Sequence, residues 1–350
     1  GTLAEWATRL AANDYSVGAK TMVLASRGCV GDCSYCGGQS LRRIYKSEHA
    51  TVPRVRRHSL TYIMELVKHY KSNGAVFIQF CVDYFVFPTN EMIEFFKKYK
   101  AEINLPFFAH FMVDQLARNE ALLNAIVDAG IFMFGIGIQS GDEKFCLDVY
   151  NRKNNNDHII TVVEKFISQG VCGYCDLIAG NPLETEDNII ETLNLLRRLP
   201  QFDPSFKAFI TLRINKLFYP QENVPLLDKY PQLRTMNSDM DLYVYHSYLY
   251  NLRLVLNDNE FELIYTDKRY KKNPLLLESI YLEHLEKKHT EYLKYHIDRL
   301  RGQDVYYYGS GEAYKARKQM MSALFPQAVL LDTPTQTIVD GIPVHNAAHF

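Results

Sequence analysis

The chain alternates short apolar, β-rich runs with longer segments of helical period, and this alternation constrains its fold more than any other feature. The apolar runs lie at 21–28, 75–83, 106–114, 131–140, 171–180 and 206–219. The helical segments between them include 59–74, 89–100, 119–130, 157–170 and 185–199. Strands that alternate with helices form parallel sheets buried on both faces, and a right-handed series of such units curves into a barrel. We therefore expect an α/β fold, a partial (βα)6 TIM-like barrel, with functional side chains at the carboxyl ends of its strands.

The pattern changes after about residue 226. Residues 275–302 have the period of a long, charged amphipathic helix, and the tyrosine-rich stretch 241–256 predicts a packed helix in preference to a channel lining. Residues 304–332 predict a strand, a glycine turn, a helix and a second strand. Two strands are too few for a complete fold, so we expect a helical extension followed by an incomplete Rossmann-like unit.

Composition disfavours several classes of protein. The net charge of −1 gives no overall field that would attract nucleic acid or an anionic membrane. No apolar run approaches the roughly 18 residues that a transmembrane helix needs. The chain has seven cysteines, three of them clustered, which argues against a secreted disulfide framework. We therefore expect a cytoplasmic protein without a membrane partner.

Three cysteines stand close together in "RGCVGDCSYCGGQ", residues 27–39. Cys29, Cys33 and Cys36 have the spacing C-x₃-C-x₂-C, which allows one loop to hold a soft metal centre. Zinc would normally take a fourth ligand from a second cysteine pair or a nearby histidine, and neither is adjacent. An iron–sulfur cube on three cysteines leaves one iron open to a small molecule. The spacing alone favours a cluster but leaves a structural zinc site open.

This stretch resembles the cysteine motif of the radical S-adenosylmethionine (SAM) superfamily, C-x₃-C-x-aromatic-C, with Tyr35 as the aromatic residue. The resemblance extends from residue 20 to about 220. It implies that Cys29, Cys33 and Cys36 hold a [4Fe–4S] cluster and that SAM binds the open iron through its amino and carboxylate groups, with Tyr35 packed beside it. It also implies reductive cleavage of SAM to methionine and a 5′-deoxyadenosyl radical.

Further motifs resemble the SAM contacts of this family. Asp83, in "FCVDYF", stands where the family often has Gly-Gly-Glu, and is similar to the acidic version in the subgroup that often carries a cobalamin-binding domain. The resemblance implies that Asp83 contacts the SAM amino group, although a turn cap is an equal alternative. In "GIGIQSGDEKFCLDVYNR", it implies that Gln139 and Ser140 face the ribose or carboxylate of SAM. Arg152 would pair with that carboxylate, which suits a guanidinium.

The motif "DLIAGNPLETEDN", residues 176–188, resembles the fifth-strand motif of the family. The resemblance implies that Ile178 and Gly180 lie against the adenine of SAM. Leu183 replaces a second glycine that the family often has, so the loop geometry departs from the family pattern. Thr185 is expected to cap the next helix.

Two other features have ordinary structural interpretations. Cys172 and Cys175 form a second C-x₂-C pair, but residues three apart on a strand point to opposite faces, so we expect buried cysteines that do not share a metal. The segment 41–59 is locally basic, which suits phosphate or nucleic acid, but a solvated surface is the favoured interpretation.

A partial dinucleotide-binding pattern lies in "YYYGSGEA", residues 306–313. Gly309 and Gly311 occupy the expected turn, and Asp332 follows at the end of the next strand, where a ribose contact belongs. Tyr314 stands in place of the third glycine. Nucleotide binding here is therefore the less favoured interpretation.

The sequence thus predicts four parts: a lead-in (1–20), a radical SAM partial barrel (21–225), a helical extension (226–302) and a Rossmann-like fragment (303–350). We expect an enzyme that abstracts hydrogen from a small-molecule or biosynthetic-intermediate substrate, with electrons from a donor such as flavodoxin or ferredoxin. One alternative is a cobalamin-dependent radical SAM methyltransferase; only 28 residues precede Cys29, so its cobalamin domain would have to lie upstream of this chain. A metal-stabilised binding module is the non-enzyme alternative. The sequence specifies neither the substrate nor the residues that react with it.

Overall fold

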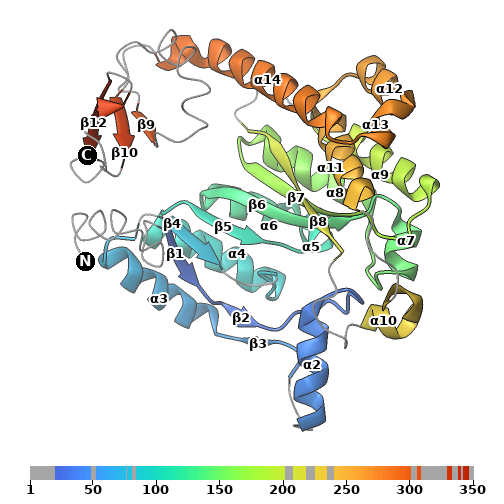
Figure 1. The fold of residues 1–350 in the computed structure, drawn as a ribbon. Coiled ribbons are helices and arrows are strands. Elements are labelled where there is room, and N and C mark those ends of the chain that lie inside the picture. The colour runs from blue at the N-terminus through green and yellow to red at the C-terminus, as the bar shows by residue number, and fades with distance from the viewer. Residues whose placement is uncertain are drawn as a thin grey trace.

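A computed structural model describes the chain over residues 20–48, 53–75, 77–80, 84–201, 208–217, 225–234, 240–300, 306–308, 329–332, 338–339 and 342–346. Within these ranges, six strands form one parallel sheet in the order β1-β4-β5-β6-β7-β8 (Figure 1). They are β1 (Lys20–Val23), β4 (Phe77–Phe80), β5 (Phe107–His110), β6 (Ile131–Gln139), β7 (Cys172–Ala179) and β8 (Ile210–Lys216). Spatial neighbours follow one another in chain order with helices between them, which confirms the α/β fold and the partial TIM-like barrel.

Helices connect these strands. Those at 60–72, 89–98, 120–128, 156–168 and 186–198 lie where the sequence predicts them, whereas the short helices at 113–117 and 143–148 were not predicted. In chain order, the connecting helices are α3 (Leu60–Ser72), α4 (Thr89–Lys98), α5 (Val113–Ala117), α6 (Glu120–Asp128), α7 (Glu143–Asp148), α8 (Asn156–Ser168) and α9 (Glu186–Arg198). Ser59 caps α3 by accepting a hydrogen bond from the amide of Tyr62, and Thr185 forms a reciprocal capping box with Asn188 at the start of α9. These side chains satisfy amides that have no partner inside the helix.

Side chains alternate between the two faces of the sheet. On the helix-covered face, Ile78, Phe80, Phe134 and Leu177 are fully buried, and aromatic rings from β4, α4 and β5 pack against one another. The opposite, concave face bears polar groups from β5, β7 and β8. Gly135 makes this arrangement possible, because a Cβ at that position would lie 2.4 Å from the ring of His110 and 3.1 Å from that of Tyr174.

The apolar run at 21–28 does not form one strand. β1 ends at Val23, and β2 (Ser26–Arg27) pairs instead with β3 (Arg56–Arg57) in a separate antiparallel ribbon. Gly28, with φ +83°, follows this ribbon, and a Cβ there would lie 2.3 Å from the carbonyl oxygen of Arg54. The close backbone crossing therefore requires glycine, and it moves the cysteine segment away from the sheet.

After the barrel, α10 (Pro225–Lys229) precedes α11 (Met240–Val255), which packs across β7, β8 and α9. Tyr245, Leu249 and Tyr250 of α11 are buried, as expected for a packed helix. The helices α12 (Asp258–Thr266), α13 (Lys268–Lys272) and α14 (Leu276–Leu300) complete the extension. No helix in the described ranges combines the length and apolar character that crossing a membrane would require.

The C-terminal segment has more strands than the sequence predicts. A four-stranded sheet has the order β11-β12-β10-β9 and comprises β9 (Tyr306–Tyr308), β10 (Val329–Asp332), β11 (Ile338–Val339) and β12 (Ile342–Asn346). The expectation of two strands was wrong because β11 has two residues and β12 contains Pro343, so both carry weak local strand signals. Asp332 ends β10 as expected, whereas Gly309, Gly311 and Tyr314 lie outside the described residues.

Candidate functional site

The cysteine loop joins β2 to α2 (Gly37–Glu48). Cys29, Cys33 and Cys36 are each half-buried on this loop. A Cβ at Gly31 would lie 3.5 Å from Cys29 Sγ and 3.6 Å from Cys33 Sγ, so residue 31 sits between two of the three sulfur atoms. The Gly31 amide also donates to Cys29 Sγ at 3.3 Å. The absence of a side chain at this position leaves space between the sulfurs.

The loop is fixed by the segment that follows α7. The Ser34 amide donates to the Tyr150 carbonyl at 2.8 Å, and the Ser34 hydroxyl donates to the Val149 carbonyl at 2.7 Å. The Asn151 side chain, on a residue with φ 48°, donates to the Asp32 carbonyl at 2.9 Å. These bonds hold the cysteines against residues that are more than a hundred positions later in the chain. Tyr150 and Asn151 were not singled out by the sequence.

Arg152 lies next to the cysteine loop. Its Nη1 is 2.9 Å from the Tyr84 hydroxyl and 3.7 Å from Cys33 Sγ, its Nε donates to Asn154 Oδ1 at 3.0 Å, and its Nη2 donates to the Gly137 carbonyl. A Cβ at Gly137 would lie 3.0 Å from Arg152 Nη2 and 3.3 Å from the Tyr84 hydroxyl. Glycine at 137 therefore allows the guanidinium and the phenol to reach the strand.

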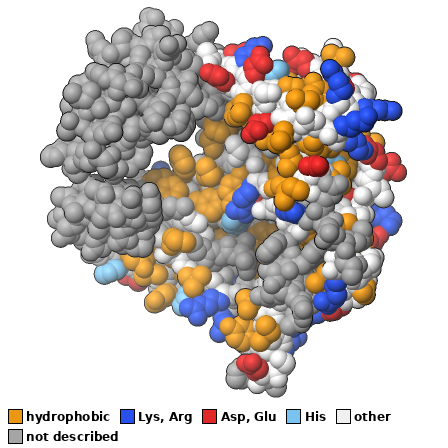
Figure 2. Space-filling view, in the orientation of Figure 1, with side chains coloured by type: hydrophobic (Ala, Val, Ile, Leu, Met, Phe, Trp, Pro, Cys, Tyr) orange, Lys and Arg blue, Asp and Glu red, His pale blue; other side chains and the backbone are white. Residues whose placement is uncertain are grey.

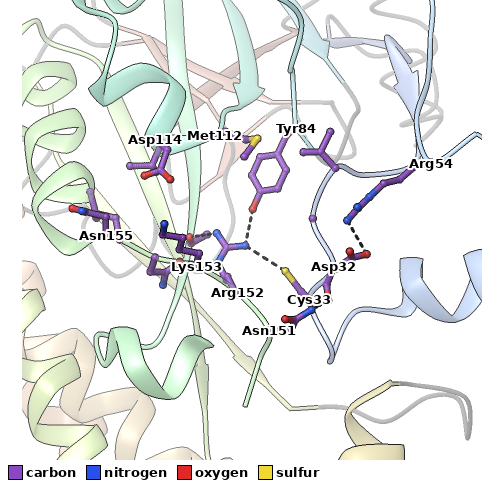
Figure 3. Close-up of a pocket in the computed structure, with 16 residues that line it drawn as sticks. Asp32, Cys33, Arg54, Tyr84, Met112, Asp114, Asn151, Arg152, Lys153 and Asn155 are labelled. Atoms are coloured by element: carbon purple, nitrogen blue, oxygen red, sulfur yellow. Dashed lines mark hydrogen bonds and ion pairs between the residues drawn. The ribbon is translucent and has the colours of Figure 1, made fainter. Parts of the chain in front are cut away.

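A pocket of about 440 Å³ opens beside this arginine (Figure 3). Figure 3 shows Arg152 between Tyr84 and Cys33, with Asp114 and Met112 across the pocket. The other labelled lining residues are Asp32, Arg54, Asn151, Lys153 and Asn155.

The guanidinium of Arg152 keeps its positive charge in this pocket. Asp32 pairs with Arg54 at 2.7 Å and Asp114 pairs with His158 at 2.7 Å, and no carboxylate of the described residues lies within ion-pair distance of Arg152. Burial raises the pKa of Tyr84, although Arg152 opposes the shift, so the phenol is neutral and does not balance the charge. An anionic group in the pocket would supply the missing partner.

A second cavity, of about 260 Å³, is lined in part by Tyr35 of the same loop. Its lining residues are Tyr35, Gln139, Asp176, Ile178, Arg213, Asn215, Lys216 and Leu217. The Tyr35 ring packs edge-on against Tyr150 with centroids 5.0 Å apart, and burial raises the pKa of its phenol well above the usual range. Gln139 has a left-handed backbone, φ 71°, where the β6–β7 register shifts. This irregularity re-aims the last side chain of β6 toward the cavity.

The expected SAM contacts thus fall into three groups. Arg152 lines the first pocket together with Cys33, and Tyr35, Gln139 and Ile178 line the second cavity. Ser140 lines neither, because it is fully buried with its hydroxyl 3.2 Å from that of Thr192.

Gly180 also lies away from the lining. Its φ is +67°, and a Cβ there would lie 2.8 Å from Cβ of Tyr243, so glycine allows α11 to approach. Asp83 and Cys81 are outside the described residues. The roles of all the expected contacts toward SAM stay predictions, including those that line a cavity.

Two groups of residues near the site were not foreseen. Tyr84 directly follows Asp83 in the sequence. Its position just after a predicted strand was the signal that could have marked it as a site residue. On the concave face, His110 Nε2 lies 2.7 Å from the Tyr174 hydroxyl, and the Arg213 guanidinium lies over the Tyr174 ring at 4.6 Å while pairing with Asp176. These residues are far apart in sequence and form no local motif, so only the sheet register joins them.

The three cysteines of this loop are suitable ligands for a metal cofactor. In the part of the chain that the structure describes, no group of three or more histidine, cysteine and acidic side chains has an arrangement that could hold a single metal ion. In a [4Fe–4S] cube each cysteine binds a different iron, so the sulfurs surround a larger object. The gap that Gly31 leaves between Cys29 and Cys33 fits this requirement. Cys172 and Cys175 do not converge: Cys175 is fully buried on the helix side of β7, and Cys172 is half-buried.

The site lies within a segment that matches a known family. Residues 23–196 match the model of the radical SAM superfamily. This segment is a radical SAM domain. The match confirms the resemblance seen in the cysteine motif, and it includes all three cysteines and every expected SAM contact. No curated protein matches the chain.

Several solved structures resemble the radical SAM domain and its surroundings. The methyltransferase TsrM from Kitasatospora setae, with cobalamin and a [4Fe–4S] cluster bound, is 13% identical with a TM-score of 0.46, over 57% of this chain and 38% of that one. The cobalamin-dependent radical enzyme OxsB, with aqua-cobalamin and SAM bound, is 14% identical with a TM-score of 0.48, over 91% and 51%. Methylornithine synthase (PylB) is 16% identical with a TM-score of 0.41, over 72% and 68%. With every TM-score below 0.5, these likenesses carry no functional conclusion.

Proposed function

We propose that the protein is a radical SAM enzyme in which Cys29, Cys33 and Cys36 hold a [4Fe–4S] cluster and SAM binds beside it. The observation that supports this most directly is the Arg152 guanidinium, which lies 3.7 Å from Cys33 Sγ without a carboxylate partner among the described residues. A positive group next to the cysteine loop suits a ligand that carries a carboxylate to the cluster.

The two cavities suit the two ends of SAM. The methionine carboxylate would pair with Arg152 in the first pocket, while adenine would lie in the second cavity, where Ile178 offers an apolar surface. Gln139 lines that cavity, so its amide is available to the ribose. The cysteine loop contributes to both, because Cys33 lines the first pocket and Tyr35 lines the second cavity.

A reduced cluster held by the three cysteines would supply one electron to the sulfonium of SAM, and the products would be methionine and a 5′-deoxyadenosyl radical able to take a hydrogen atom from a small-molecule substrate. The side chains of this chain position the reactants. Burial keeps Tyr35 and Tyr84 neutral, so the fixed positive charge of Arg152 stays available for the carboxylate. The bonds from Ser34 and Asn151 hold the cysteine loop at a constant distance from that charge.

The test is anaerobic reconstitution with iron and sulfide, followed by SAM and dithionite, with 5′-deoxyadenosine and methionine measured by chromatography. The protein should form both products, and Cys36→Ala should form neither. A colourless protein, or a loaded cluster that cleaves no SAM under any reductant, would support the metal-stabilised binding module instead.

The cobalamin-dependent alternative predicts different products. Methyl transfer would yield S-adenosylhomocysteine and require added cobalamin together with the substrate. Repeating the assay with cobalamin and following S-adenosylhomocysteine separates this alternative from hydrogen abstraction. Recovery of the full-length gene would show whether a cobalamin domain lies upstream.

A further inference from the structure

The segment that bears the cysteines is strongly basic although the chain is nearly neutral. Residues 27–58 contain seven Lys and Arg against two Asp and Glu, a formal charge of +5. Because the whole chain has a formal charge of −1, the remaining residues sum to −6. Such an asymmetry creates a local field that attracts acidic partners to the cysteine loop.

Helix α2 presents this charge to solvent. It begins at Gly37, directly after Cys36, and projects away from the sheet (Figure 1). Ser40 is its only buried residue, while Leu41, Ile44 and Tyr45 are 50%, 39% and 47% exposed. Figure 2 shows hydrophobic side chains at the surface of this projection. A helix with an exposed apolar stripe at i, i+3 and i+4 has a face suited to a partner.

Ion pairs within the protein leave excess positive charge around α2. Asp32 is shared by Arg42 at 3.0 Å and Arg54 at 2.7 Å. Asp228 of α10 pairs with Arg43 and lies 4.0 Å from Arg234. Each of these two carboxylates lies between two arginines. Each set of one carboxylate and two arginines therefore has a net charge of +1.

A pocket of about 280 Å³ lies within this surface. It is lined by Asp32, Gln39, Arg42, Arg43, Lys46, Asn151 and Pro225. Asp32 stands between Cys29 and Cys33, so the pocket adjoins the cysteine loop. It shares Asp32 and Asn151 with the first pocket, but none of the proposed SAM contacts Arg152, Tyr35, Gln139 and Ile178 lines it.

We propose that the exposed face of α2, with its apolar centre of Leu41, Ile44 and Tyr45 and its cations Arg43 and Lys46, is the docking surface for an acidic one-electron carrier protein. The inference rests on the proposed function. On docking, the carrier loses one electron and the cluster held by the adjacent cysteines gains it. A small apolar patch flanked by cations suits the weak, charge-steered encounters that electron transfer uses.

The test compares two reductants in the reconstituted full chain. Arg43→Glu/Lys46→Glu reverses two charges on the docking face, and Lys97→Glu/Lys98→Glu makes the same charge change on exposed positions of α4. With reduced flavodoxin as the acidic carrier, the α2 variant should cleave SAM about tenfold more slowly than wild type, whereas the α4 variant should match wild type. With dithionite, all three proteins should react at the same rate. Equal flavodoxin-driven rates in both variants would overturn the proposal.

Further measurements separate this proposal from the proposed function. If wild type cleaves no SAM even with dithionite, the proposed function fails, but flavodoxin affinity can still be measured by flavin fluorescence. A dissociation constant at least tenfold higher for the α2 variant supports docking, and an unchanged one overturns it. Wild-type binding of a short RNA duplex that the α2 variant loses, with no difference toward flavodoxin, would show a nucleic-acid surface and would also overturn it. Unchanged circular dichroism and thermal midpoints would show that both variants fold.

Discussion

The Nη1 atom of Arg152 lies 2.9 Å from the hydroxyl oxygen of Tyr84, and the same nitrogen lies 3.7 Å from the sulfur of Cys33. Tyr84 is 68 residues and Cys33 is 119 residues from Arg152 along the chain. The cysteine loop, the segment after β4 and the segment after α7 therefore meet at one guanidinium. Its geometry should determine how tightly the site binds a carboxylate.

Replacing Arg152 by lysine should weaken SAM binding by about tenfold or more, because an ammonium cannot donate in several fixed directions at once. Equilibrium dialysis of the reconstituted protein would measure the SAM dissociation constant. Iron content should stay at the wild-type value, since the cysteines are unchanged. Lys153→Met, in the same pocket, is the matched control and should have a smaller effect. Equal SAM dissociation constants for Arg152→Lys and wild type would show that Arg152 does not bind SAM.

Gly31→Ala should lower the iron bound per chain while leaving the stability of the metal-free protein unchanged. The added methyl would contact the sulfurs of Cys29 and Cys33 at 3.5 and 3.6 Å, a tolerable distance that nevertheless fills the space between them. Gly37→Ala is the control, because a Cβ there meets nothing within 4 Å. Iron analysis and visible absorbance after reconstitution provide the measurement. Full loading of Gly31→Ala would show that the gap is not needed.

Gly180→Ala should destabilise the protein more than Gly130→Ala. Both glycines have positive φ, +67° and +91°. An alanine in this left-handed conformation is strained, which lowers the free energy of unfolding by about 1 kcal/mol at either position. Only at Gly180 would the new Cβ also press on Tyr243, at 2.8 Å, and overpacking of this kind adds roughly 1–3 kcal/mol. Urea denaturation measures both. Equal losses would mean that α11 shifts to make room.

Glu184 should make the protein less stable as the pH rises. Both of its carboxylate oxygens are buried without a hydrogen-bond partner in the described part of the chain, and burial raises the pKa of the carboxyl to about 8. An unfolded glutamate loses its proton near pH 4.3. Between these values the folded state holds more protons than the unfolded state, so the free energy of unfolding falls with increasing pH and levels off above about pH 8.

The change Glu184→Gln should remove most of this dependence. At pH 8 the variant should be more stable than wild type by on the order of 3 kcal/mol, with a small difference at pH 5. Denaturant titrations at the two pH values measure it. Glu191→Gln, on the exposed side of α9, should leave the wild-type pH profile intact. A Glu184→Gln profile parallel to that of wild type would show that the carboxyl ionises normally.

The strand and helix pattern was predictable because its signals are local. Apolar periodicity placed the six strands of the sheet and the longer helices between them, and Thr185 marked a helix start through hydrogen bonds that span three residues. The short strands β11 and β12 escaped prediction, since a few residues carry little periodicity and their pairing depends on β10.

The sequence alone predicted a metal centre at the cysteine loop, because three thiols stand at a fixed spacing on one short segment, and the segment that contains them matches the radical SAM family. Only the tertiary structure decided which expected contacts face a cavity. It placed Arg152 beside Cys33 and turned the Ser140 hydroxyl toward Thr192. It also re-aimed Gln139 through the register shift at the end of β6. The direction of a side chain at a strand end depends on strand register and on the helix packed beside it, and neither is a property of neighbouring residues.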